Sequence, residues 1–257
     1  MTVLTLPACP SAGEAAGWSV EPGPAGGPLL VVLSGLAPEG QEPAFEGRGL
    51  CRRLGVNGLL LRDHSRSWFL RGVRGTGDDL EAVAAAVRAH VAATAPSRVV
   101  LMGNSAGGYA AIALASLLEE VDEVVALVPR SGLTHEVNDA LGDDRFSSLR
   151  AAAVEGLPAS AEPFLDLPTL LTDRFAARCT DGRPPYRTRV RVLHASDNAL
   201  DAAHAARLAG LPETVVSTYP RGDHQLASVL RTAGELDVVV GAALTGPRVR
   251  GPLSRTA

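Results

Sequence analysis

Short apolar runs alternate along the chain with longer stretches in which apolar residues recur at helical spacing. The runs are continuous, as in residues 29–33 (LLVVL) and 99–102 (VVLM). A strand that is buried on both faces of a parallel sheet requires such a run. We therefore expect strands at residues 29–33, 56–61, 99–102, 124–128, 190–193 and 214–218.

The stretches between these runs predict helices at residues 45–54, 78–93, 105–118, 201–210 and 225–242. Alternation of strand and helix predicts an α/β fold, with a mostly parallel sheet and helices on both faces. A length of 257 residues fits one such unit, so we expect a single domain over residues 1–257.

Residues 131–188 interrupt this alternation. They contain no strand-like run, but they carry several prolines and short Ala/Leu segments. We expect a small helical insertion at the carboxyl edge of the sheet, where ligands bind in open α/β folds. Either a lid over the site or a packed excursion fits this pattern. We expect the tail, residues 246–257, to be disordered.

Composition limits both the packing and the chemistry. Aromatic residues are only 4% of a chain that is 46% hydrophobic, so Ala, Val and Leu must fill the core. The net charge of −4 gives no general attraction to nucleic acid or to an anionic membrane, and we expect neither as a partner. All 24 basic residues are arginine, which excludes a lysine Schiff base or a serine–lysine dyad. This arginine usage also suggests a bacterial protein from a GC-rich genome.

The cysteines and the N-terminus exclude other classes. Cys9, Cys51 and Cys179 lie at unrelated spacings, which indicate neither a disulfide framework nor a zinc site. We expect buried thiols, no metal and no other cofactor. Residues 1–18 show no charged leader before an apolar core, and no window is long enough to span a bilayer, so we expect a cytoplasmic protein.

A candidate nucleophile follows the third apolar run. The pentapeptide Gly103-Asn-Ser105-Ala-Gly107 comes directly after a predicted strand and before an Ala-rich predicted helix. This G-x-S-x-G pattern is typical of a serine on a sharp strand-to-helix turn, where small neighbours let the two elements approach closely. Ser105 is therefore the candidate nucleophile.

A serine hydroxyl needs a base, usually histidine, and the base in turn needs a carboxylate. We favour His224, which lies between the last predicted strand and the final helix, over His64 and His194. For the acid we favour Asp197, in the loop after the penultimate strand. Asp201 is the alternative, but we expect it to cap the helix that follows.

The order of strands, the GNSAGG elbow, the acid in HASDNALD and the histidine in YPRGDHQ resemble the α/β-hydrolase superfamily over residues 29–242. The resemblance implies a Ser-Asp-His triad of Ser105, Asp197 and His224. It also implies an oxyanion hole formed by two backbone amides, which by position are those of Ala106 and Leu36. Where many members have a His-Gly pair, this chain has Ser34-Gly35.

Other residues near these motifs are candidate substrate contacts. They are Ser34, Asn104, Trp68 and Arg71, the last two from a loop with four arginines that could bind a carboxylate, a phosphate or a carrier-linked acyl group. Alternatively, that loop is a solvated arginine segment in which Asp63 is paired locally.

We therefore expect a serine hydrolase that cleaves an ester or thioester, with a small-molecule or carrier-linked acyl substrate. Two alternatives stay open. An acyltransferase or cyclase would use the same acyl-serine, and a non-catalytic α/β-hydrolase-like protein would only bind.

Overall fold

The computed structural model describes residues 16–180 and 188–246. A seven-stranded sheet forms the centre, in the order β1-β3-β2-β4-β5-β6-β7. The strands β2 to β7 are parallel to one another, and β1 pairs antiparallel with β3 at one edge. The strands are β1 (Trp18–Glu21), β2 (Leu29–Leu33), β3 (Asn57–Leu61), β4 (Val99–Asn104), β5 (Glu123–Leu127), β6 (Arg189–Ala195) and β7 (Thr214–Tyr219).

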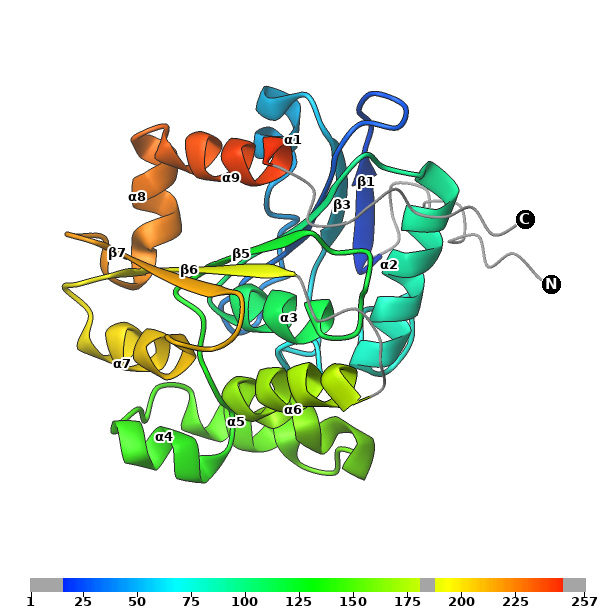
Figure 1. The fold of residues 1–257 in the computed structure, drawn as a ribbon. Coiled ribbons are helices and arrows are strands. Elements are labelled where there is room, and N and C mark those ends of the chain that lie inside the picture. The colour runs from blue at the N-terminus through cyan, green and yellow to red at the C-terminus, as the bar shows by residue number, and fades with distance from the viewer. Residues whose placement is uncertain (1–15, 181–187, 247–257) are drawn as a thin grey trace.

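Helices cover both faces of this sheet (Figure 1). One face carries α1 (Arg48–Leu54), α8 (Leu226–Thr232) and α9 (Glu235–Thr245). The opposite face carries α2 (Leu80–Thr94), α3 (Ala106–Ala115) and α7 (Ala199–Leu208). The predicted α/β class is therefore confirmed.

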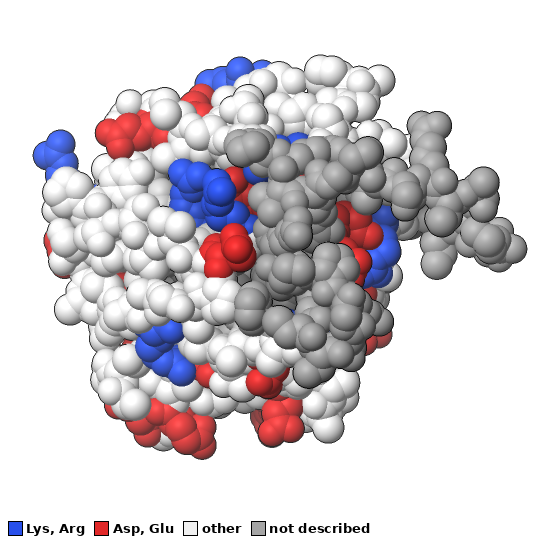
Figure 2. Space-filling model, in the orientation of Figure 1, with Lys and Arg blue, Asp and Glu red and all other residues white. Residues whose placement is uncertain are grey.

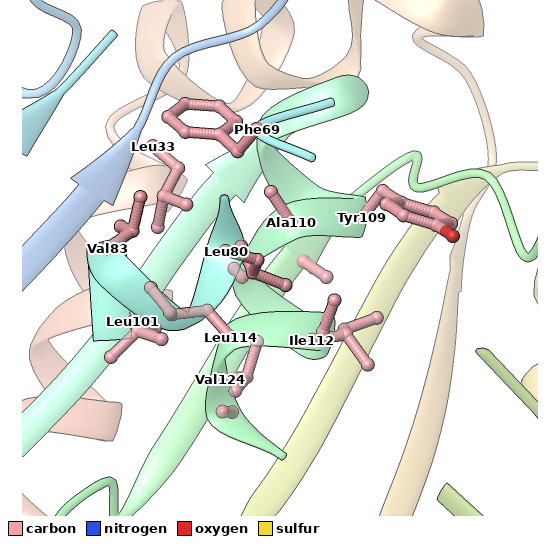
Figure 3. Packing of buried hydrophobic residues seen from close by; sticks show 14 of the residues in the cluster. Leu33, Phe69, Leu80, Val83, Leu101, Tyr109, Ala110, Ile112, Leu114 and Val124 are labelled. Carbon is pink, nitrogen blue, oxygen red and sulfur yellow. The ribbon is translucent and has the colours of Figure 1, made fainter. Parts of the chain in front are cut away.

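The continuous apolar runs explain these two layers. All five residues of β2 are buried, and alternate side chains enter opposite cores. Leu29, Val31 and Leu33 join the core beneath α3, whereas Leu30 and Val32 join the core beneath α8 and α9. Because side chains alternate along a strand, an apolar residue at every position serves both layers. Figure 3 shows the first core, with strand residues packed against α3.

Residues 131–180 form a helical segment between β5 and β6. It contains α4 (His135–Leu141), α5 (Ser147–Val154), the 3-10 helix η1 (Ala159–Leu165) and α6 (Leu167–Thr180). The segment is anchored: Phe164 and Leu167 belong to the core beneath α3, and the Tyr109 hydroxyl donates to the carbonyl of Phe164. Its role as a lid stays a prediction.

The structure differs from the sequence predictions in three elements. The β1 strand was not predicted, because its four residues form no continuous apolar run. The predicted final helix is two helices, since Gly234 adopts a positive φ of 74° between α8 and α9. The helix predicted at residues 201–210 is α7, which begins at residue 199. Of the predicted tail 246–257, only Gly246 lies within the described residues.

On the face drawn in Figure 2, acidic and basic side chains are interspersed, and the described residues form no continuous basic surface there. No described helix is long and apolar enough to cross a membrane.

Candidate active site

Ser105 stands at the turn between β4 and α3. Its backbone has φ 52° and ψ −113°, which an L-residue rarely adopts. The turn is tight enough that a Cβ on Gly103 would lie 2.1 Å from the backbone of Gly107, and one on Gly107 would lie 2.0 Å from the carbonyl oxygen of Leu33. Glycine at both positions is therefore required by contact with backbone atoms, as the pentapeptide predicts.

His224 lies over this serine. It belongs to a short 3-10 turn, η2 (Asp223–Gln225), which follows β7. Its Nε2 atom is 2.9 Å from Ser105 Oγ, across 119 residues of sequence. The base and the nucleophile predicted from the sequence are thus within hydrogen-bond distance of each other.

The carboxylate on the far side of His224 belongs to Asp201. Its Oδ2 atom is 2.8 Å from His224 Nδ1. The prediction that Asp197 fills this position is wrong. Asp197 instead accepts the backbone N–H groups of Gly222 and Asp223 at 3.1 and 2.8 Å, and so holds the loop that carries the histidine.

Helix capping explains the exchange of roles. Because α7 begins at residue 199, Asn198 is its N-cap, and the side-chain oxygen of Asn198 accepts the N–H of Asp201 at 3.0 Å. The Asp201 side chain is therefore free of the capping task that the sequence analysis assigned to it.

Environment keeps Asp201 ionised. Its burial favours the neutral carboxyl, but hydrogen bonds and charge from His224 and then Arg145 outweigh this, so the pKa of Asp201 lies below its ordinary value. Asp201 is 2% exposed and the His224 side chain 30% exposed. A buried carboxylate thus faces a ring that solvent and small molecules can reach.

The two backbone amides predicted to form the oxyanion hole are those of Ala106 and Leu36. Ala106 is the first residue of α3, where helix N–H groups lack partners and the helix dipole is positive. Leu36 follows β2, and among the described residues neither its amide nor that of Ala106 donates to a protein acceptor. The neighbouring amide of Gly35 is bound to Glu46 Oε1 at 3.0 Å, which anchors the loop that carries Leu36.

Comparison with solved structures identifies the architecture. A capsule O-acetyltransferase of Neisseria meningitidis serogroup A is similar with a TM-score of 0.63 at 10% identity, over 87% of this chain and 90% of that one. A fluorophosphonate-binding serine hydrolase of Staphylococcus aureus gives 0.56 at 16% identity, over 88% and 84%. A monoacylglycerol lipase of Paleococcus ferrophilus gives 0.51 at 14% identity, over 88% and 97%. The chain has the α/β-hydrolase fold.

Sequence comparisons add nothing to this α/β-hydrolase assignment. No family model matches the chain, and no curated protein matches it. The fold is therefore established by structural similarity at low identity, and the chemistry has to be argued from the residues.

Most of the predicted substrate contacts are placed elsewhere in the α/β-hydrolase fold. Ser34 and Trp68 are each 1% exposed, so the prediction that they touch substrate is wrong. The Arg71 guanidinium donates to the carbonyls of Ala152 and Glu155 at the end of α5, and so caps that helix instead. Asn104 lies beside Ser105 with its Oδ1 buried and unpaired among the described residues, and its contact with substrate stays a prediction.

The loop before α2 is organised by Asp63. Its carboxylate accepts the backbone N–H groups of Ser65, Ser67 and Phe69 within 3.0 Å, and it also accepts the Ser65 hydroxyl. Asp63 is thus paired locally, with backbone N–H groups and a hydroxyl, while the solvated arginine segment of that alternative stays a prediction.

The competing nucleophiles and bases are occupied. His194 Nε2 lies 2.9 Å from the hydroxyl of Thr218, and His64 Nε2 lies 2.9 Å from Glu42. Burial and then the charge of Glu21 raise the pKa of Cys51 to about 11, so this thiol stays protonated at neutral pH. Among the described residues no group of His, Cys, Asp or Glu is arranged to hold a metal.

A groove on the α1 and α8 face of the sheet is lined by sequence neighbours of Ser105 and His224, but not by these two residues themselves. It has a volume of about 590 Å³ and runs between the sheet and the helices α1 and α8. Its lining includes the neighbours of both residues, Asn104 and Gln225, together with Phe45, Glu46, Met102 and Arg231.

Sequence reasoning missed one functional neighbour. Arg145, in the insertion before α5, places Nη1 2.8 Å from Asp201 Oδ1. The local sequence Asp143-Asp-Arg145 reads as an exposed charged turn, and the contact spans 56 residues that only the fold brings together.

Proposed function

We propose that the protein is a serine hydrolase that cleaves an ester or thioester through an acyl-serine intermediate. The observation that carries this proposal is the continuous chain of hydrogen bonds from Ser105 to His224 to Asp201, at 2.9 and 2.8 Å. Nucleophile, base and acid in this order are what acyl transfer requires of side chains at neutral pH.

In this proposal, each proton has a place. Asp201 accepts the Nδ1–H of His224, which leaves the Nε2 lone pair free to accept the proton of Ser105. As Oγ attacks the acyl carbonyl, His224 takes that proton, and the negative charge on the carbonyl oxygen is stabilised by the amides of Ala106 and Leu36. His224 then gives the proton to the departing alcohol or thiol. In the second half, His224 deprotonates a water, which attacks the acyl-serine. His224 then returns this proton to Ser105 Oγ as the bond between Oγ and the acyl carbon breaks and the acid leaves.

O-acyl transfer is the second candidate. It is favoured by the similarity to the capsule O-acetyltransferase, which has the highest TM-score of the three neighbours described above. Transfer uses the same acyl-serine, and an acceptor alcohol takes the place of water in the second half. The substrate class common to both candidates is a small or carrier-linked acyl ester.

Turnover of p-nitrophenyl acetate by the wild type and by Ser105→Ala tests the reaction class. We expect the variant to keep its melting temperature within a few degrees and to lose activity by at least about a thousandfold. Full turnover by a folded Ser105→Ala variant would refute the proposal.

Product analysis separates hydrolysis from transfer. The acyl product is followed with and without an added sugar or short alcohol, at concentrations that do not unfold the protein. Free acid as the sole product supports hydrolysis. An acylated acceptor formed at a rate above that of the uncatalysed reaction supports transfer.

A further inference from the structure

We propose that Arg145, supplied by the helical insertion, is a positioning residue that holds the catalytic acid Asp201 on the side opposite His224 and sets the proton affinity of the Asp201–His224 pair. The inference rests on the proposed function only in naming Asp201 the catalytic acid. Its physical content is an ion pair between the insertion and α7.

The two oxygens of Asp201 have separate partners. Oδ2 accepts from His224 Nδ1 at 2.8 Å, and Oδ1 accepts from Arg145 Nη1 at 2.8 Å. Asp201 is 2% exposed, so water does not replace either partner readily. Because each carboxylate oxygen is hydrogen-bonded to its own partner, the plane of the carboxylate is fixed relative to the imidazole.

Arg145 is itself held rigidly. Its Nε and Nη2 atoms donate to the two oxygens of Asp143 at 3.0 and 2.8 Å, a bidentate pair. Its carbonyl oxygen accepts from Arg130 at 2.8 Å and also from Arg150. With the guanidinium fixed by one carboxylate, little side-chain entropy is lost in binding the second.

The anchor of this arrangement is Asp143, whose side chain is fully buried. Burial favours its neutral form, but hydrogen bonds from His204 and Arg145 and the charges of Arg130 and Arg145 outweigh that effect, so its pKa lies well below its ordinary value. Asp143 therefore stays a carboxylate at neutral pH, and the guanidinium stays in place.

Arg145 also acts through its charge. A cation beside Asp201 shares the carboxylate's negative charge and makes a second cation, the protonated ring of His224, less favourable. The charged and titratable groups around the Arg145–Asp201 pair come from five segments: Arg130 between β5 and α4, Asp143 and Asp144 between α4 and α5, Arg150 on α5, His204 on α7 and His224 on η2. Of these, only His224 lies against the second oxygen of Asp201.

The test is a pH titration of the His224 ring by NMR on the full chain, with the signal assigned by its absence in His224→Gln. For Arg145→Gln we expect the ring to gain its proton at a pH about half a unit to one unit above that of the wild type, because the competing cation is gone. Arg145→Lys keeps the charge and should titrate within about 0.3 units of the wild type.

Arg207→Gln is the matched control. Arg207 lies on α7, pairs with Asp166 at 2.8 Å, and has a side chain 28% exposed, against 24% for Arg145, but it does not touch Asp201. We expect no change in the His224 titration. An unchanged titration in Arg145→Gln, or an equal change in Arg207→Gln, would overturn the proposal.

A second variant guards against misfolding. If Arg145→Gln does not fold, because the buried Asp143 loses one of its two arginine partners, the double variant Asp143→Asn/Arg145→Gln removes both charges of the pair and should also show an upward change. No change in a folded double variant would also reject the proposal.

Activity provides an independent readout. In Arg145→Gln, the acid limb of the pH profile of kcat/KM should move to higher pH together with the NMR titration. In Arg145→Lys, this limb should stay at the pH of the wild type, and kcat should fall several-fold because the geometry is altered. Absence of turnover in the wild type would reject the proposed function, while the NMR titration would still decide the role of Arg145.

Discussion

At the residue scale, three polar side chains in and just before α7 have different main tasks. Asn198 caps α7, Asp197 holds the backbone of the histidine loop, and Asp201 orients the imidazole of His224. The three residues lie within five positions of one another, and their different tasks follow from where α7 begins. A carboxylate already satisfied by backbone amides is a poor partner for a ring, which is why Asp197 and Asp201 are not interchangeable.

This division of tasks predicts unequal effects of the same substitution. Asp201→Asn should lower kcat by a factor of about a thousand or more, because an amide at this position favours the wrong ring tautomer. Asp197→Asn should lower kcat by no more than about tenfold, since the side-chain oxygen of the asparagine can still accept a loop N–H. Steady-state kinetics on both variants, with circular dichroism as the folding control, checks this. Equal losses in the two would contradict the assignment.

The sequence could predict Ser105 and His224 because each lies in a recognisable place: a pentapeptide after a strand, and the loop after the last strand. It could not choose between Asp197 and Asp201, because the start of α7 is uncertain by about two residues. Trp68 and Arg71 were misassigned for another reason. A large ring or a guanidinium beside a motif can equally fill the core or cap a helix, and only packing decides.

At the scale of elements, the elbow between β4 and α3 depends on contact between backbones. The Gly107 Cα faces the carbonyl oxygens of Leu33 and Ser34, so helix and strand are nearer than any side chain allows. This close approach holds Ser105 in its strained backbone conformation and places the N-terminus of α3 directly after the serine.

Gly107→Ala should therefore fail to fold or should lose several kcal/mol of stability, because a Cβ there would overlap backbone atoms that cannot move independently. Gly49→Ala in α1 is the control, since its nearest contact is the flexible end of Arg53 at 3.4 Å, and it should be neutral or stabilising by about 0.5–1 kcal/mol. Urea unfolding of both compares them. A Gly107→Ala variant as stable as the wild type would show that the turn is looser than described.

Most strands were predictable because they are buried. The strands β2 to β6 were predicted to within a few residues, because a strand covered on both faces needs an uninterrupted apolar run. The edge strand β7 was also predicted, although none of its residues is buried. The edge strand β1, with only two of its four residues buried, shows no such signal. The break between α8 and α9 at Gly234 was not predicted, because the helical spacing of apolar residues continues through it.

At the scale of the whole molecule, the insertion is joined to the rest of the fold through a buried polar cluster. His204 of α7 places Nε2 2.9 Å from Asp143, and its Nδ1 accepts the N–H of Ser131 at 3.1 Å. The ring is therefore neutral, with its proton on Nε2. Burial first, and then the charges of Arg130 and Arg145, lower the pKa of His204, although Asp143 acts in the opposite direction.

This neutral histidine predicts how stability depends on pH. The unfolded chain binds a proton at His204 near pH 6.5, whereas the folded protein does so only at lower pH, so folding is disfavoured as the pH falls below about 6.5. His90, whose pKa burial also lowers, contributes with the same sign. In His204→Gln, the free energy of unfolding should fall less steeply between pH 7.5 and 5 than in the wild type.

Urea denaturation at several pH values measures this slope, and His135→Gln is the control because His135 lies on the surface in α4, with a side chain 83% exposed. In this control, the free energy of unfolding should change with pH as steeply as in the wild type. A His204→Gln slope as steep as that of the wild type would show that the buried ring carries no part of the acid sensitivity.

The central claim is that Ser105 is an activated nucleophile, and a fluorophosphonate tests it most directly. The protein is incubated with the probe at neutral pH, digested, and the modified residue is located by mass spectrometry, with His224→Gln as the comparison. The account predicts a stoichiometric adduct on Ser105 that forms at least about a hundredfold more slowly in His224→Gln. An unmodified Ser105 in the folded wild type, or an equal rate in the variant, would contradict it.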